Sequence, residues 1–241
     1  MSSNRPSGIN SDPPASLLMQ LPASLRLKDD LAFPDPATAT PEGLVAIGGD
    51  LSVPRLLLAY RSGIFPWTTR PITWWSPDPR AVFELEHFHI PRRLAKLIRQ
   101  QPFTVTRDVA FRQVMEACAQ SASGREETWV TPEFIRAYTQ LHQQGHAHSV
   151  ECWRGPELVG GIYGVAIGGC FAGESMFHRV DNASKVALCH LVEQLRARRF
   201  RLFDIQMVTP ATRVFGPVEL SRCEYLQRLG AAVALPCSFH P

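Results

Sequence analysis

Two acids and an amide interrupt apolar segments in the C-terminal third of the chain. Glu174 stands in GGCFAGESMF, and Asp204 and Gln206 stand in RLFDIQM. Successive side chains of a strand point to opposite faces, so Asp204 and Gln206 share a face about 7 Å apart, and Glu174 shares one with Met176. Two such strands side by side would form a pocket that is acidic at one end and apolar at the other.

An exposed strand end and a hairpin tip are the plainer explanation of these residues, because charged side chains are mostly exposed. Their apolar surroundings favour the pocket, since a buried charge without a partner is costly. We therefore expect a cationic ligand or partner at Glu174 and Asp204.

The histidines and cysteines are weaker candidates. His146 and His148 lie at a helix-to-strand turn and could ligate a metal, but no third ligand stands at a suitable spacing, so a structural or surface role is favoured. Cys189 and His190 are adjacent on a predicted helix and do not face each other, which argues against a Cys–His nucleophile. The six cysteines form no CxxC pair, so we expect buried thiols in a reducing compartment, without a disulfide or a zinc site.

Two basic groups and several tryptophans have two explanations each. Each basic group is either a solvated face or a phosphate-binding surface. The first group is Arg92, Lys96 and Arg99, and the second is Arg196, Arg198, Arg199 and Arg201. The tryptophans either stack on a base or an apolar side chain or belong to a core. They are Trp67, Trp74, Trp75 and Trp129.

Composition sets few limits on function. The 241 residues carry a formal net charge of +3, with 45% hydrophobic and 20% charged residues, which excludes neither an enzyme nor a binding protein. The longest apolar run, 158–172, is shorter than the roughly 20 residues of a membrane span and contains five glycines. The first residues lack the pattern of a secretory signal, so we expect a cytoplasmic protein.

The elements that must position these residues indicate an α+β fold. Residues 31–80, rich in Pro and Gly, predict short elements and one helix after Ser52. Beyond them we expect helices over 131–146, capped by Thr131 and ended by Gly145, and over 182–199, capped by Asn182. Residues 148–177 predict an antiparallel meander, and 201–208 a further strand.

The chain divides at about residue 80 in this interpretation. We expect a disordered extension over 1–28, a small irregular domain over 29–80 and an acyltransferase domain over 81–241. The order of elements in the last part resembles an N-acetyltransferase (GNAT-related) fold, which does not by itself give a function. The loop HRVDNASK lacks the glycines that a CoA pyrophosphate would need, which counts against an acetyl-CoA donor.

Many segments, in order, resemble those of one family. They are LVAIGGDLS, LLLAYRSGIFPW, WWSPDPR, TWVT, GHAHSVE, LVGGIYGV, GESMF, NASK, DIQ and YLQRLG. Together they resemble the leucyl/phenylalanyl-tRNA–protein transferases, over residues 31–230. The resemblance implies a cytoplasmic bacterial enzyme that moves leucine or phenylalanine from Leu-tRNA or Phe-tRNA to the N-terminal Arg or Lys of an acceptor protein. This transfer marks the acceptor for degradation and uses no metal or organic cofactor.

The resemblance also implies roles for particular residues. The apolar pocket for the donor side chain would be Tyr60, Trp67, Trp129, Ile162, Phe171 and Met176. Glu174 and Asp204 would bind the cationic acceptor. From the needs of aminolysis we hypothesise that Gln206, held by Asp204, positions the attacking amine or the ester carbonyl, and that Asp204 favours proton loss, as a base or as an orienting group. The group Arg92, Lys96 and Arg99 would bind tRNA.

One departure and two alternatives accompany this interpretation. The family commonly has a histidine at the position of Ala211, so the contacts of the loop after Gln206 are open. A Fem-like transferase, which adds amino acids to peptidoglycan precursors, would share fold and donor but not acceptor. A noncatalytic tRNA-binding or tRNA-editing protein would bind tRNA without transfer.

Overall fold

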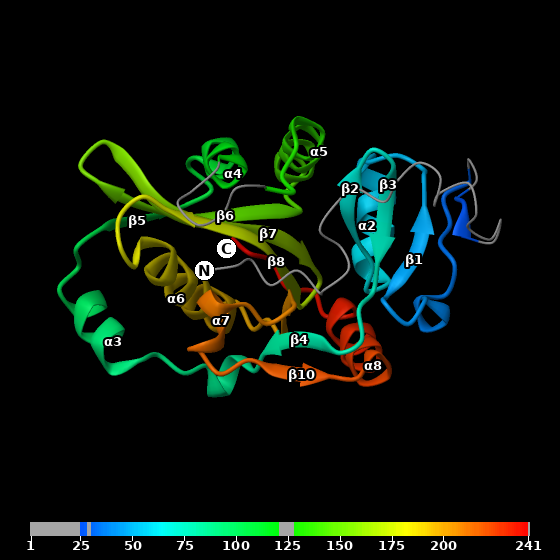
Figure 1. The fold of residues 1–241 in the computed structure, drawn as a ribbon. Helices are drawn as coiled ribbons and strands as arrows, with labels where there is room; N and C mark the ends of the chain where they lie inside the picture. Colours follow the sequence, from blue (N-terminus) through cyan, green and yellow to red (C-terminus); the bar gives the residue numbers. More distant parts are fainter. Residues whose placement is uncertain (1–24, 28–29, 121–127, 241) are drawn as a thin grey trace.

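The computed structural model describes residues 25–27, 30–120 and 128–240. The extension predicted for residues 1–28 therefore lies outside the described residues, apart from 25–27. The described chain forms a three-stranded sheet with strand order β1-β3-β2 and a seven-stranded sheet with strand order β10-β4-β9-β8-β7-β6-β5 (Figure 1). This mixture of helices and sheets agrees with the predicted α+β class.

The strands of the small sheet are β1 (Leu44–Ile47), β2 (Phe65–Thr69) and β3 (Ile72–Trp75). The strands of the large sheet are β4 (Arg80–Phe83), β5 (Thr104–Arg107), β6 (Ala147–Arg154), β7 (Glu157–Ile167), β8 (Cys170–His178), β9 (Leu202–Gln206) and β10 (Val218–Leu220). The α-helices are α2 (Val53–Arg61), α3 (Arg92–Arg99), α4 (Phe111–Ala119), α5 (Pro132–Gln143), α6 (Ala183–Ala197), α7 (Pro210–Arg213) and α8 (Arg222–Val233). Two short 3-10 helices are η2 (Pro36–Thr38) and η3 (Leu85–His87).

The large sheet is antiparallel except for one parallel pair of described strands. Strands β6, β7 and β8 pair antiparallel in sequence order, which confirms the predicted meander, and β5 adds antiparallel to β6. Strand β4 pairs antiparallel with both β9 and β10. Among the strands of the described residues in this sheet, β8 and β9 form the one parallel pair, and α6 connects them. Their pairing covers Cys170–Ala172 and Leu202–Asp204, although β8 continues to His178. The two strands therefore part beyond Ala172.

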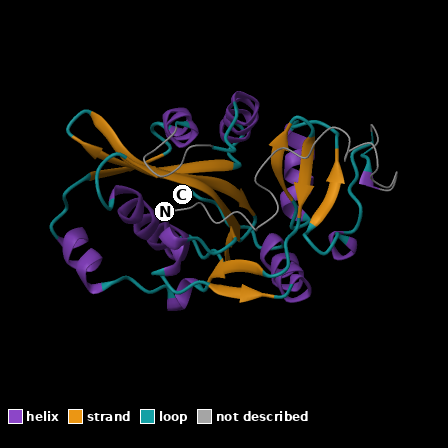
Figure 2. Ribbon diagram, viewed as in Figure 1, coloured by secondary structure: helices purple, strands orange, loops and turns teal. Residues whose placement is uncertain are grey.

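Helices cover both faces of the large sheet. Figure 2 shows α4 and α5 on one side and α6 on the other. Buried side chains of α4, α5 and α2 pack in one cluster with residues of β7, and the apolar face of α6 packs in a second cluster with Phe171 and Phe203. Each fully buried Leu or Phe in these clusters contributes about 1.5–3 kcal/mol relative to an exposed position.

The two long helices test the predicted caps. The Thr131 hydroxyl accepts a hydrogen bond from the Phe134 amide at 3.4 Å, and Gly145 follows α5 with φ of 77°, so both predicted signals of this helix are confirmed. Asn182 does precede α6, but it adopts the left-handed conformation with φ of 66° and makes no side-chain capping bond. Asn182 therefore occupies the predicted N-cap position but does not cap α6 with its side chain, because its backbone conformation differs from the extended one that a capping residue normally has.

Among the described residues, no helix is long and apolar enough to cross a membrane.

Candidate active site

Glu174 is the extra residue of a β-bulge in β8. Tyr163 pairs with Ser175 and Gly164 with Gly173, so Glu174 has no partner of its own on β7. A bulge breaks the alternation of side chains and redirects the inserted one. Glu174 accordingly lies next to Tyr60 of α2 and Tyr138 of α5.

Met176 belongs to the opposite face of the sheet, where it packs with the cluster under α6. The prediction that Glu174 and Met176 share a face is therefore wrong, because strict alternation does not hold across the bulge. The apolar wall beside Glu174 comes instead from the residues of α2 and α5.

Gln206 reaches Glu174 from the end of β9. Its side-chain amide Nε2 donates to Glu174 Oε1 at 3.0 Å. Its backbone is left-handed, with φ of 56°, which costs a residue with a Cβ about 1–2 kcal/mol. Such strain persists where the surrounding structure imposes it, and it is common at functional sites.

Asp204 is enclosed by donors from the protein itself. Arg80 donates to both carboxylate oxygens, from Nε to Oδ1 at 2.9 Å and from Nη2 to Oδ2 at 2.6 Å. The Tyr225 hydroxyl donates to Oδ2 and the Gln206 amide N–H to Oδ1, both at 2.9 Å. Only 1% of Asp204 is exposed.

The cation expected at Asp204 is thus Arg80 and not an external ligand, which corrects the inference from the apolar surroundings. Direct contact between Asp204 and an acceptor stays a prediction; in the structure Asp204 accepts a hydrogen bond from the Gln206 backbone. Of the two acids, Asp204 is buried and Glu174 is half-buried, so Glu174 is the one accessible to a ligand.

Arg80 connects the small sheet to this site. Its Nη1 donates to the Gly63 carbonyl at 3.2 Å, and its guanidinium lies 4.8 Å from the centre of the Phe65 ring and 4.5 Å from that of Tyr225. Burial disfavours the charge of Arg80, but Asp204 more than offsets burial and raises the pKa of the guanidinium above its ordinary value. Arg80 and Asp204 therefore form a stable ion pair that fixes β9 to β4.

Glu174 is held in a different electrostatic state. Burial raises the pKa of Glu174 to about 8, although hydrogen bonds from Tyr60 and Gln206 act in the opposite direction. The hydroxyls of Tyr60 and Tyr138 hydrogen-bond to each other, and burial together with Glu174 raises the pKa of both phenols well above 10. Glu174 is therefore mostly protonated at neutral pH in the free protein, and a bound cation would favour its charged form.

The six positions predicted for the donor pocket fall into two packing groups. Those packed with the cluster on the α4 and α5 face are Tyr60, Trp67 and Trp129. Those packed with the cluster under α6 are Ile162, Phe171 and Met176. Phe171 is 1% exposed and its ring centre lies 5.8 Å from that of Phe203, a core environment. A single pocket lined by both groups stays a prediction.

Comparison with known proteins decides the family. The family model described as leucyl/phenylalanyl-tRNA protein transferase matches residues 82–230, and the model of its N-terminal domain matches residues 49–78. This chain belongs to the leucyl/phenylalanyl-tRNA–protein transferase family. The two models together include Tyr60, Glu174, Asp204 and Gln206.

Relatives with this name match most of the chain. One from Magnetococcus marinus is 52% identical over 212 residues, which are 85% of this chain and 90% of the relative. One from Nitratidesulfovibrio vulgaris (strain DP4) is 51% identical, covering 87% and 92%, and one from Anaeromyxobacter sp. (strain Fw109-5) is 50% identical, covering 89% and 92%. The structure of L-PGS from Bacillus licheniformis aligns at a TM-score of 0.42 and 10% identity, over 70% of this chain and 66% of that one, a likeness too low to decide the fold.

The two basic groups of this leucyl/phenylalanyl-tRNA–protein transferase family member differ in their surroundings. Arg92, Lys96 and Arg99 lie on α3 and are all exposed, so their contact with tRNA stays a prediction. In the second group, Arg196 donates to the Leu85 carbonyl and Arg198 to the carbonyls of Ser238 and His240. These two arginines therefore connect the end of α6 to η3 and to the C-terminal segment.

Three residues of the site were not predicted as site residues, and each had a visible signal. Arg80 is an isolated cation at the start of the apolar strand AVFEL, a position that needs a buried acid as partner. Tyr138 and Tyr225 lie on the apolar faces of helices, where a phenol needs a hydrogen-bond partner. Sequence alone does not show which partner each one has.

The loop that departs from the family pattern forms α7. Thr209 and Thr212 exchange backbone and side-chain hydrogen bonds at its N-terminus, in a capping-box arrangement. Ala211 lies within this short helix and is exposed.

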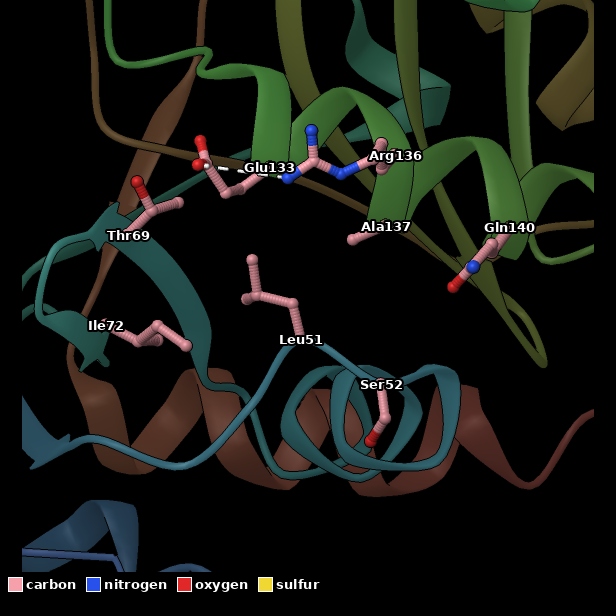
Figure 3. A pocket seen from close by; sticks show the side chains of 8 residues that line it. All are labelled: Leu51, Ser52, Thr69, Ile72, Glu133, Arg136, Ala137 and Gln140. Carbon is pink, nitrogen blue, oxygen red and sulfur yellow. Dashed lines mark ion pairs between the residues drawn. The ribbon is translucent and has the colours of Figure 1, made fainter.

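A separate pocket lies between α5 and the small sheet. Its volume is about 410 Å³. Figure 3 shows its lining side chains, Leu51, Ser52, Thr69, Ile72, Glu133, Arg136, Ala137 and Gln140. None of them is a residue predicted for donor or acceptor binding, so this pocket is distinct from the site at Glu174.

Proposed function

We propose that this protein transfers leucine or phenylalanine from Leu-tRNA or Phe-tRNA to the N-terminal Arg or Lys of acceptor proteins, which marks them for degradation. The observation that carries this proposal is the accessible Glu174 carboxyl, bonded to Gln206 and without a cation of its own among the described residues, in a chain of this family. The donor and acceptor identities follow from the family resemblance, and the geometry supports them.

Glu174 suits a cationic acceptor. It is half-buried and its hydrogen-bond partners in the described part of the chain are hydroxyl and amide groups. The side chain or α-amine of an N-terminal Arg or Lys would therefore be the first full positive charge in direct contact with it. A charge-assisted hydrogen bond to a carboxylate is roughly twice as strong as a neutral one. An acceptor that begins with a neutral residue would lack this interaction.

The donor side chain enters, in this proposal, where β8 and β9 part beyond Ala172. In this proposal the donor side chain lies next to Gln206, where the aromatic residues Trp67 and Trp129 on one face and Met176 on the other would line its pocket. An apolar slot admits Leu and Phe and disfavours polar side chains, because an unpaired buried polar group costs about 1–3 kcal/mol.

The reaction is aminolysis of an ester and needs no covalent intermediate with the enzyme. The α-amine nitrogen of the acceptor attacks the ester carbonyl carbon, a C–N bond forms, and the bond to the ribose oxygen breaks. The amine proton finally passes to that oxygen. An α-amine has a pKa of about 7.7–8.0, so a substantial fraction is neutral and nucleophilic near neutral pH.

Gln206 positions the reacting groups in this proposal. Its amide can bond the attacking amine or the developing oxyanion. Asp204, through its bond to the Gln206 N–H and its pair with Arg80, holds Gln206 in its strained conformation. Asp204 also favours proton loss from the amine by its charge, either as the end of a relay or as an orienting group.

The basic residues Arg92, Lys96 and Arg99 would bind tRNA phosphates. We further propose that residues 81–241 form a GNAT-related domain after a small domain over 29–80. The single parallel pair, β8 and β9, connected by α6 and parting at one end, supports that relationship. A cytoplasmic location follows from the donor, since aminoacyl-tRNA is used there.

One assay tests the proposal. Labelled Leu-tRNA or Phe-tRNA is mixed with the protein and with peptides that begin with Arg, Lys or Ala and are otherwise identical. We expect label on the Arg and Lys peptides only. Binding of tRNA without transfer to any peptide would support a noncatalytic tRNA-binding protein, and transfer to the lysine side chain of a peptidoglycan precursor would support a Fem-like enzyme.

A further inference from the structure

Three potential metal ligands from distant parts of the chain converge at one point outside the candidate active site. They are Asp108, which follows β5, His148 of β6, and His240 near the C-terminus. His148 Nδ1 lies 2.6 Å and His240 Nε2 lies 2.5 Å from the same oxygen, Asp108 Oδ2. The three ligand atoms all lie within 4.8 Å of one another. This grouping supplies the third ligand that the sequence around His146 and His148 lacked.

The backbone and its neighbours hold Asp108 in place. Asp108 has a left-handed backbone with φ of 58°, and its Oδ1 accepts a hydrogen bond from the Ser149 amide at 2.7 Å. The Asp108 amide donates in turn to the Ser149 carbonyl at 3.1 Å. These bonds direct Oδ2 toward the two histidines.

The histidines are held as firmly. The His148 ring stacks on Phe239 at 4.2 Å between centres, and Phe239 is 2% exposed. Gln194 donates to the Phe239 carbonyl at 2.5 Å, and Arg198 donates to the His240 carbonyl at 2.6 Å. The segment that carries His240 is thus positioned by α6 before any ion binds.

The chemistry of this group is that of a transition-metal site. His148 Nδ1 and His240 Nε2 both face one carboxylate oxygen at short hydrogen-bond distance, so an ion bound here would replace these hydrogen bonds and move the three ligand atoms slightly apart. Two imidazoles and a carboxylate suit Zn²⁺ and similar ions, which bind such ligands at about 2.0–2.2 Å. His240 is exposed, which leaves room for ion entry and for a water as fourth ligand.

We propose that Asp108, His148 and His240 bind one divalent transition-metal ion of the Zn²⁺ type, which ties the C-terminal segment to strand β6. Both imidazoles bind in the neutral form, with the proton on the nitrogen that does not face Asp108. His142 lies nearby, with its Nδ1 3.8 Å from Asp108 Oδ1, but that nitrogen is already bonded to the Ala147 carbonyl at 2.8 Å.

This site is separate from the transfer site. His148 packs with Phe239 and the cluster under α6, whereas Glu174 lies next to Tyr60 and Tyr138 on the opposite face of the sheet. The ion is therefore structural and takes no part in aminoacyl transfer.

Metal binding by variants tests this proposal. The untagged full chain is stripped with EDTA and titrated with Zn²⁺ and, separately, with Co²⁺, with bound metal measured by atomic emission and by the Co²⁺ absorption spectrum. We expect one ion per chain, and an affinity that falls by more than about 100-fold in Asp108→Asn and His240→Gln, since loss of even an outer-shell partner costs 10–100-fold.

His190→Gln is the matched control, because His190 also faces an acid, Glu193 at 3.3 Å, but belongs to no group of three ligands among the described residues. This variant should bind Zn²⁺ like the wild type. Zn²⁺ should also raise the Tm and slow hydrogen exchange at residues 236–240 in the wild type and in His190→Gln, but not in His240→Gln. Equal Zn²⁺ affinity of the wild type and His240→Gln, or no stoichiometric binding by the wild type, would overturn the proposal.

Discussion

Glu174 and Asp204 show how similar acids acquire different properties from their neighbours. Asp204 faces Arg80 across two hydrogen bonds inside the protein. Glu174 faces two phenols and an amide, and burial raises its pKa to about 8. The first acid is paired within the protein, and the second is the one that we propose to bind the cation of the acceptor.

The raised pKa of Glu174 should make the stability of the folded protein depend on pH. The unfolded Glu174 carboxyl loses its proton near pH 4.5 and the folded one near pH 8. Between these values the unfolded state gains more from ionisation, so the native state is progressively destabilised as pH rises, and the full cost is present above pH 8. Glu174→Gln removes the cost, so its Tm should exceed that of the wild type more at pH 8 than at about pH 5. The same Tm difference at both pH values would contradict the assigned pKa.

Substitutions of Gln206 can test both the role of its side-chain amide and the cost of its left-handed backbone. Gln206→Ala should lower kcat by about 10²–10³, the typical effect of removing one oxyanion donor, with unchanged affinity for Phe-tRNA. Gln206→Gly should be as inactive but more stable than Gln206→Ala by about 1 kcal/mol, because only glycine relieves the positive φ. Exposed Gln113 of α4 provides the control, and Gln113→Ala should keep full activity. A large drop in tRNA affinity in Gln206→Ala would show that Gln206 binds the donor instead.

At the scale of elements, β4, β8 and β9 assemble the site by departures from regular strand geometry. A bulge redirects Glu174, β9 ends in a left-handed residue, and β4 contributes Arg80 to its neighbour. Periodicity predicted α5, α6 and the β6–β7–β8 meander because each has a long apolar pattern. It did not predict the bulge or the position of β4 beside β9, since strand pairing depends on residues that are far apart in the sequence.

The pairing of β4 with β9 should respond strongly to removal of Arg80. Arg80→Met leaves Asp204 as a buried charge without a cation, and we expect a decrease of about 3–5 kcal/mol in the free energy of unfolding. Denaturant unfolding measures this decrease. The double variant Arg80→Met with Asp204→Asn should recover part of it, since the uncompensated charge is gone. Additive effects of the two single variants in the double variant would show that the ion pair is not coupled.

Helix α3 carries the test of tRNA binding. Arg92→Glu with Arg99→Glu should weaken binding and make the slope of log K against log salt shallower, by about 0.9 for each phosphate that the protein no longer neutralises. Arg112→Glu on α4, also exposed, is a control that should leave affinity and slope unchanged. Unchanged values in the α3 variant would return these residues to a solvated face.

At the scale of the whole molecule, the small sheet and α2 complete the site that the large sheet begins. Tyr60 lies against Glu174, and the Gly63 carbonyl accepts from Arg80. Gly63 also packs on α8, where an added Cβ would lie 2.7 Å from a methyl carbon of Leu226 and 3.0 Å from the Tyr225 ring. The junction is therefore closely packed around one glycine.

Gly63→Ala should disturb this junction. Gly63 and Gly48 both have positive φ, 75° and 89°, but nothing lies within 4 Å of a Cβ added at Gly48. Both alanine variants should be destabilised by about 1–2 kcal/mol through backbone strain. Gly63→Ala should be destabilised further and should also have a lower kcat, because the added carbon displaces Tyr225 from Asp204. Thermal unfolding and the transfer assay measure the two effects. Equal stability and activity of the two variants would show that the junction tolerates the extra carbon.

The family, the α+β class, the two long helices and the three candidate residues Glu174, Asp204 and Gln206 could all be predicted from the order of residues. These depend on local patterns and on short motifs, which the order of residues contains in full. The three-dimensional arrangement was needed to show that Asp204 pairs with Arg80, that Glu174 stands on a bulge apart from Met176, and that Asp108 and His240 meet His148. Each of these contacts joins segments that are far apart in the sequence. Packing of the whole chain therefore determines which partner a buried charge or a potential metal ligand has.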